Sequence, residues 1–84
     1  MYRVFWVSRT AEAACKRFPS DVREALHAMI ASLAENPHPE GCLKLTGSGG
    51  WRVRVARSYR LVYEIDRAER TVTLLEFGDR KNIY

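Results

Sequence analysis

The sequence predicts a small α+β domain in which an N-terminal strand and a two-helix hairpin pack on an antiparallel β-sheet. Between residues 20 and 35 the apolar side chains recur with the period of an amphipathic helix. Over residues 50–56 and 59–66, apolar and polar residues alternate as they do in half-buried strands. Short links join these two segments to each other and to a third strand-like segment at 71–77, and links of this kind favour antiparallel neighbours.

The chain has 84 residues, which predicts a single domain, 1–84, around one hydrophobic core. No apolar run approaches the roughly 20 residues that a membrane-spanning helix needs. The first residues lack the apolar stretch and small-residue cleavage site of a signal peptide. Cys15 and Cys42 lack metal-ligand spacing, so we expect free thiols and no metal. Together these observations predict a cytoplasmic protein without membrane contact.

The N-terminal half contains one predicted strand and two predicted helices. Residues 2–7 are β-branched and aromatic and predict the strand. A short helix follows to about residue 17, with Ser8 or Thr10 as its cap. The second helix starts at the N-cap Ser20 and stops before Pro37. Its apolar positions lie on one stripe and are Val22, Ala25, Leu26, Met29, Ile30 and Leu33.

The sequence of residues 38–50 predicts an irregular connecting segment that contains several glycines. We expect the side chains of Leu43 and Leu45 to be buried beneath the sheet. The glycine-rich run 47–50 lacks the Gly-Lys-Ser/Thr ending of a phosphate-binding loop, so it indicates a turn. His27 and His38 are interpreted as solvated surface histidines, because neither accompanies an acid and a nucleophile in a catalytic pattern.

The net charge of +4 lies entirely in the C-terminal half of the chain. Residues 1–43 carry five basic and five acidic side chains, whereas residues 44–84 carry nine basic and five acidic ones, a difference of four. No acid occurs between Lys44 and Arg60. This asymmetry indicates a polyanionic partner, of which nucleic acid is the commonest.

Arg52 and Arg54 share one face of the predicted strand at 50–56, since successive side chains alternate between faces. Arg60 joins them on that open face if the next strand pairs in register. Two guanidinium groups two residues apart lie within about 7 Å and repel each other unless an anion lies between them. An RNA phosphate fits, because arginine presents a planar fork of donors. The alternative interpretation is a half-buried strand whose solvent face is merely basic.

Several short motifs occur in a fixed order: Asn36-Pro37, Lys44-Leu45-Thr46-Gly47, Trp51-Arg52-Val53-Arg54-Val55, Tyr59-Arg60-Leu61-Val62-Tyr63-Glu64-Ile65, Gly78-Asp79-Arg80 and Tyr84. In this combination the chain resembles the RelE family of bacterial toxins, which belongs to the RelE/ParE superfamily of type II toxin–antitoxin systems. The resemblance covers nearly the whole chain. It implies a RelE-like domain with the order β-α-α-β-β-β.

The resemblance also implies an activity and its partners. Family members are mRNA interferases: they enter the A site of the small (30S) ribosomal subunit, cleave the bound mRNA without a cofactor and stop translation. A cognate antitoxin is implied as the protein partner. We expect an acidic or amphipathic antitoxin segment to cover the basic surface.

The family's catalytic positions fall on Arg52, Arg54, Arg60, Arg80 and Tyr84. The best-known RelE proteins carry lysines at the first two of these positions. Arginine keeps its proton at ordinary pH and cannot act as a base. The resemblance therefore assigns charge stabilisation to the arginines and abstraction of the ribose 2′-OH proton to Tyr84. Further RNA contacts are expected from the basic residues Lys44, Arg57 and Lys81.

Two other functions are compatible with the same residues. One is a ParE-like toxin that poisons a topoisomerase, although that branch generally lacks the five matched positions. The other is a catalytically inactive module that binds RNA or an antitoxin. Induction in a bacterium should arrest translation for the first function, trigger a DNA-damage response for the second and have little effect for the third.

Overall fold

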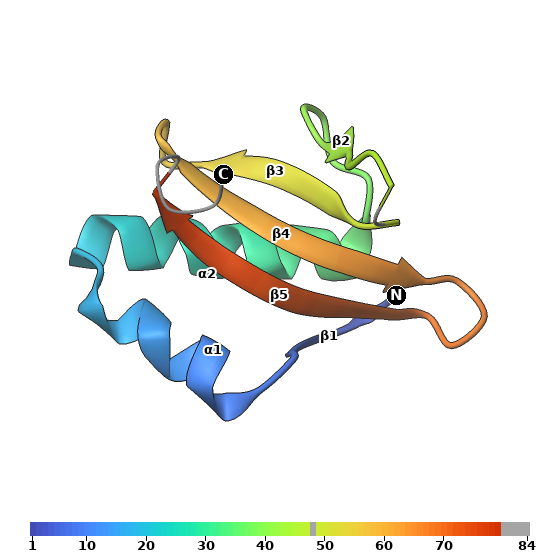
Figure 1. The fold of residues 1–84 in the computed structure, drawn as a ribbon, viewed down its shortest axis with the longest axis horizontal. Coiled ribbons are helices and arrows are strands. Elements are labelled where there is room, and N and C mark those ends of the chain that lie inside the picture. Colours follow the sequence, from blue (N-terminus) through green and yellow to red (C-terminus); the bar gives the residue numbers. More distant parts are fainter. Residues whose placement is uncertain (48, 80–84) are drawn as a thin grey trace.

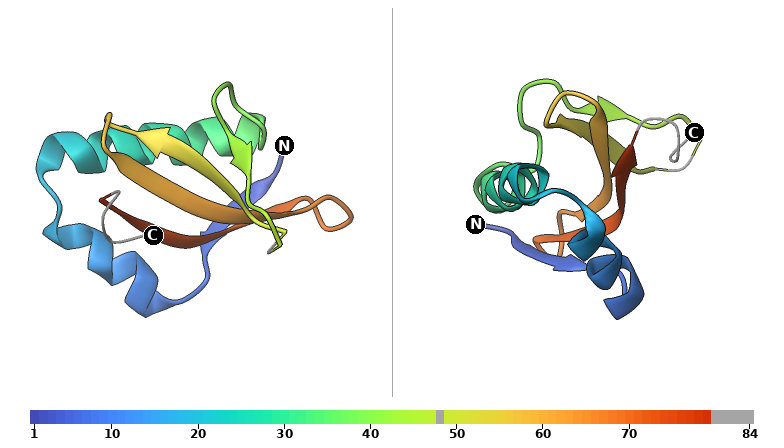
Figure 2. Two further views of the ribbon diagram at one scale, coloured as in Figure 1. Left: turned by 45° about the horizontal axis from the view of Figure 1, so that its top comes forward. Right: turned by 90° about the vertical axis from the view of Figure 1, so that its left-hand side faces the viewer.

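The structure is a computed structural model that describes residues 1–47 and 49–79. It contains one sheet with helix α2 lying across one of its faces, as Figures 1 and 2 show. The elements are β1 (Arg3–Trp6), α1 (Arg9–Ala14), a 3-10 turn (Cys15–Arg17), α2 (Ser20–Glu35), β2 (Leu43–Lys44), β3 (Trp51–Val55), β4 (Tyr59–Asp66) and β5 (Thr71–Asp79). The predicted α+β class is confirmed. No helix among these residues is both long enough and apolar enough to span a membrane.

The sheet has the strand order β1-β5-β4-β3-β2. Strands β3, β4 and β5 form the predicted antiparallel meander. The sheet as a whole is mixed, however, because β1 pairs with β5 in parallel. Residues 7–70 lie between β1 and β5, so no tight turn imposes an antiparallel arrangement on this pair. The short strand β2, which the sequence did not predict, adds an antiparallel edge to β3.

Helix α2 supplies the predicted apolar stripe to the core. Val22, Leu26 and Leu33 are buried, and the other three positions of the stripe are partly buried against them. The prediction of Ser20 as the N-cap is wrong by one position, because Pro19 is the cap and Ser20 is the first helical residue. Helix ends commonly differ by a residue or two, so the interpretation of the helix is unchanged.

Two predicted features of the connector differ in the structure. Leu43 is 53% exposed, because its pairing with Arg52 on β3 turns it to the sheet face that the helices do not cover. Only Leu45 is partly buried. His38 is not simply solvated, since its ring packs edge-on against Trp51 with 4.6 Å between ring centroids.

Tyr63 connects the centre of the sheet, through a side-chain hydrogen bond, to the segment that follows α2. Its side chain is 0% exposed, and its hydroxyl donates a hydrogen bond of 2.9 Å to the carbonyl oxygen of Pro37. Burial, followed by contact with the Cys42 thiol, raises the pKa of the Tyr63 phenol, so the hydroxyl remains a donor across the ordinary pH range.

Replacing Tyr63 by phenylalanine should lower the free energy of unfolding by about 1–3 kcal/mol, because a buried carbonyl loses its donor. Denaturant titration would measure the change. The control is Tyr59→Phe on the same strand, where the ring is only half-buried and the change should stay within about 0.5 kcal/mol. Equal losses in the two variants would contradict a specific role for the Tyr63 hydrogen bond.

Candidate functional site

The pairing of β3 with β4 brings three arginines onto one face of the sheet. Arg54 lies directly opposite Arg60, and Arg52 lies opposite Val62. Directly opposed residues project from the same face. The apolar residues Val53 and Val55 project to the other face, where they are buried in the core under α2. Arg52, Arg54 and Arg60, here called the arginine surface, therefore lie on the face away from that helix.

The register also sets the spacing of the three arginines. Opposed side chains have Cβ atoms about 4.5–5.5 Å apart, and diagonal neighbours lie about 7–8 Å apart. Arg60 is thus opposite Arg54 and diagonal to Arg52. Like charges in such positions repel and destabilise the sheet. A phosphate bound among them would remove this repulsion and accept several charge-assisted hydrogen bonds.

The three side chains differ in exposure. Arg54 is exposed and Arg52 is half-buried, as expected for an open sheet face. Arg60 joins them on this face as predicted, but it is only 9% exposed. Strand β4 is central and has a neighbour on each side, whereas β2 flanks β3 only at residues 51 and 52. The Arg60 guanidinium also donates a long hydrogen bond of 3.4 Å to the carbonyl oxygen of Tyr59.

A glycine and an acid of β5 complete this part of the face. Gly78 lies opposite Arg60, and Glu76 lies opposite Val62. Because Gly78 has no side chain, no side chain projects from β5 directly opposite Arg60. Glu76 is exposed. Sequence alternation missed it, because counting from Thr71 puts position 76 on the core side; an irregularity between Val62 and Tyr63 shifts the pairing and turns Glu76 outward.

The other predicted site residues fall in three places. Arg57 lies in the β3–β4 turn, exposed and in the left-handed region with φ 70°, near the end of the sheet that carries Arg54 and Arg60. Lys44 pairs with Trp51 and thus projects from the opposite face, so the structure does not bring it onto the arginine surface. The remaining three lie outside the described residues: Arg80, Lys81 and Tyr84.

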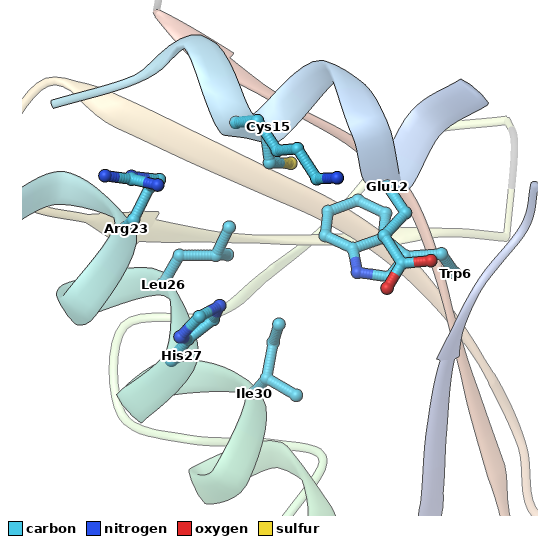
Figure 3. Close-up of a pocket in the computed structure, with 8 residues that line it drawn as sticks. Trp6, Glu12, Cys15, Arg23, Leu26, His27 and Ile30 are labelled. Atoms are coloured by element: carbon cyan, nitrogen blue, oxygen red, sulfur yellow. The ribbon is translucent and has the colours of Figure 1, made fainter. Parts of the chain in front are cut away.

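One cleft lies on the helical side of the sheet, and Figure 3 shows it. It has a volume of about 250 Å³ and lies between the two helical segments above β1. Its lining mixes apolar and charged side chains: Trp6, Glu12, Cys15, Lys16, Arg23, Leu26, His27 and Ile30. No three histidine, cysteine or acidic side chains in the described part of the chain could together hold a metal ion.

The thiol in this cleft is not set up as a nucleophile. Burial raises the pKa of the Cys15 thiol; Arg17 opposes the shift and Glu12 adds to it. The Cys15 Sγ also donates to the carbonyl oxygen of Ala11 over 3.6 Å. A thiol with a raised pKa holds less of the reactive thiolate at neutral pH.

Cys15 should therefore react with iodoacetamide more slowly than the half-buried Cys42. Its rate should keep increasing to higher pH than the rate of an ordinary thiol, because its raised pKa shifts formation of the thiolate to higher pH. Mass spectrometry of the labelled peptides over a pH series would measure both rates. The variant Cys15→Ala should keep the fast phase, and loss of that phase would contradict the assignment.

The sequence from residue 7 to residue 84 matches a family model described as the ParE toxin of type II toxin–antitoxin system, parDE. The match covers nearly the whole chain. This chain belongs to the RelE/ParE superfamily of type II toxins. No curated protein sequence matches the toxin.

The solved structures to which the toxin is similar include chains of RelE-type toxin–antitoxin complexes. A chain of the intact E. coli RelBE toxin–antitoxin complex has 26% sequence identity and a TM-score of 0.79, with 94% of this toxin and 96% of that chain covered. A chain of the Mycobacterium tuberculosis RelBE2 complex also has 26% identity, with a TM-score of 0.78 and coverages of 94% and 98%. The RelE–RelB complex from Pyrococcus horikoshii OT3 shares the fold, with 22% identity, a TM-score of 0.81 and coverages of 94% and 94%.

Proposed function

We propose that this toxin is a ribosome-dependent endoribonuclease that cleaves mRNA in the A site and stops translation. The observation that carries the proposal is the arginine surface, in which Arg54 opposes Arg60 and Arg52 lies diagonal to it. Chains of two toxin–antitoxin complexes described as RelBE and RelBE2, each 26% identical, favour the RelE branch. No cofactor is needed, because positioned cations can stabilise the charge that develops on a phosphate.

The proposed reaction is an in-line displacement within one RNA strand. The ribose 2′-oxygen loses its proton to a base and forms a bond to the adjacent phosphorus, while the bond from phosphorus to the 5′-oxygen breaks. The products are a 2′,3′-cyclic phosphate and a 5′-hydroxyl, which takes up a proton. Negative charge grows on the phosphoryl oxygens at the transition state, where the guanidinium groups of the arginine surface can stabilise it.

The three arginines suit different tasks in this reaction. Arg54 is exposed and can reach out to the incoming phosphate. Arg60 is almost buried, so its guanidinium is held in place and needs little ordering when substrate binds. Arg57 can contact a neighbouring phosphate from the turn. By resemblance to the family, Tyr84 acts as the base, and a cation close to it in the sequence, such as Arg80, would favour its phenolate.

We also propose a cytoplasmic antitoxin that covers the arginine surface with an acidic or amphipathic segment. The similar E. coli and M. tuberculosis chains come from structures of toxin–antitoxin complexes, which supports a partner of this class. Opposite charges on the two proteins would steer association and make its rate sensitive to salt.

The ParE-like alternative has one observation in its favour, which is the description of the matching family model. Adding the protein to a translation extract and mapping transcript ends separates the two functions. Ribonuclease activity should give new ends within codons, and removing ribosomes should abolish them. Intact transcripts together with a DNA-damage response after induction in cells would favour topoisomerase poisoning instead.

A further inference from the structure

Among the described residues, Glu76 is the acid that the register brings nearest to Arg60 on the face of the arginine surface, whereas Glu64 lies diagonal to Arg52 on the same face. It projects from the same face as the arginines, opposite Val62, and Arg60 lies opposite the next outward-facing residue of β5, Gly78. Glu76 and Arg60 are therefore diagonal neighbours on adjacent strands. Such neighbours lie about 7–8 Å apart, which is within reach of a glutamate and an arginine side chain.

The local charge gives this position its importance. Arg60 has one arginine opposite it and another on the diagonal, both on its β3 side. Glu76 lies on the β5 side, and Val62, which separates it from Arg52, is a short apolar residue with 8% exposure. A carboxylate only accepts hydrogen bonds, as a phosphate oxygen does. Glu76 can therefore offer the arginines the same kind of interaction that an RNA phosphate offers.

We propose that Glu76 is an internal counter-ion of the arginine surface and competes with RNA phosphate for it. This inference rests on the proposed RNA binding. The carboxylate lowers the mutual repulsion of the arginines in the free protein. It also lowers their affinity for RNA that nothing else holds in place. RNA bound in the ribosomal A site is already positioned, so it can displace the carboxylate at a smaller loss of entropy.

The expected size of the effect follows from distance. Removing one negative charge about 7 Å from Arg60 should tighten phosphate binding by about 3- to 50-fold, for effective dielectric constants between about 80 and 20. Glu69 provides a control of the same charge, because it is exposed and lies in the β4–β5 turn, beyond the end of β4 that is remote from Arg60. Asp66, the last residue of β4 before that turn, already stands four residues along β4 from Val62, the partner of Arg52, and six residues from Arg60. These separations of about 13 Å and about 20 Å exceed the screening length of about 10 Å at ordinary salt.

The experiment compares the wild type with Glu76→Gln and Glu69→Gln in ribosome-free RNA binding. The probe is a fluorescein-labelled RNA decanucleotide with 2′-O-methyl groups, which cannot be cleaved by 2′-oxygen attack. Fluorescence anisotropy at about 50 mM and about 200 mM salt gives the affinity and its salt dependence. Glu76→Gln should bind at least about 3-fold more tightly than the wild type, and Glu69→Gln should differ by less than about 2-fold. Thermal melting confirms that each variant is folded.

Two results would overturn the proposal. An equal gain in both variants would mean that only net charge matters, and weaker binding by Glu76→Gln would mean that Glu76 contacts the RNA itself. Cleavage on programmed ribosomes is measured separately. A wild-type protein that binds the probe but leaves mRNA intact would refute the proposed endoribonuclease and leave the comparison of the two variants valid.

Discussion

The double substitution Arg52→Ala and Arg54→Ala should lower the rate of mRNA cleavage on programmed ribosomes by at least about a thousandfold. Loss of one positioned donor to a developing oxyanion commonly costs about a hundred- to a thousandfold. Here two of the three cations of the arginine surface are removed at once. The measurement is single-turnover cleavage of an mRNA whose A-site codon is fixed, with the protein in excess over ribosomes.

Folding should survive this double change, which makes the loss interpretable. Arg54 is exposed and opposes another arginine, so its removal relieves a repulsion. Arg52 is half-buried, and we expect the total change in unfolding free energy to stay within about 1 kcal/mol. The matched control is Arg67→Ala, which removes an exposed arginine from the β4–β5 turn and should cleave normally. Full activity of the double variant would refute the proposed site.

The second large effect is expected for Tyr84→Phe, which removes one oxygen atom from the proposed base. The chemical step should slow by about a hundredfold or more if proton abstraction limits the rate. Ribosome binding should persist, because the aromatic ring remains. Single-turnover cleavage and ribosome binding, measured separately, distinguish a chemical defect from a binding defect.

The control for this substitution is Tyr2→Phe, which removes a phenol oxygen at the other end of the chain. It should cleave like the wild type. An unchanged rate for Tyr84→Phe would place the base elsewhere and would end the proposed role of the tyrosine. The arginine surface would keep its role in that case, because its evidence is independent of the base.

Some parts of the fold follow from local pattern and were predicted from the sequence. The stripe of α2 depends on helical period, and Val22, Leu26 and Leu33 are buried as that period requires. The common face of Arg52 and Arg54 depends only on alternation within one strand. The chain was also identified as RelE-like from its ordered motifs, and the match to the family model and the solved structures confirm this.

Other parts depend on contacts between distant segments, and only the tertiary structure determined them. The parallel pairing of β1 with β5 joins the two ends of the described chain, where no local signal sets a direction. The near burial of Arg60 arises because β4 has a strand on each side. Lys44 leaves the arginine surface because its pairing with Trp51 turns it to the other face.

Glu76 illustrates the difference between the two kinds of information. Its type and its place in a strand could be read from the sequence, but alternation alone puts it on the core side. One irregularity in the pairing of β4 with β5 reverses the faces of the residues beyond it, because side chains in a strand alternate with a period of two. The sequence alone thus determined which residues carry the charge. The register between strands decided that Glu76 lies on the same face as Arg60 and diagonal to it.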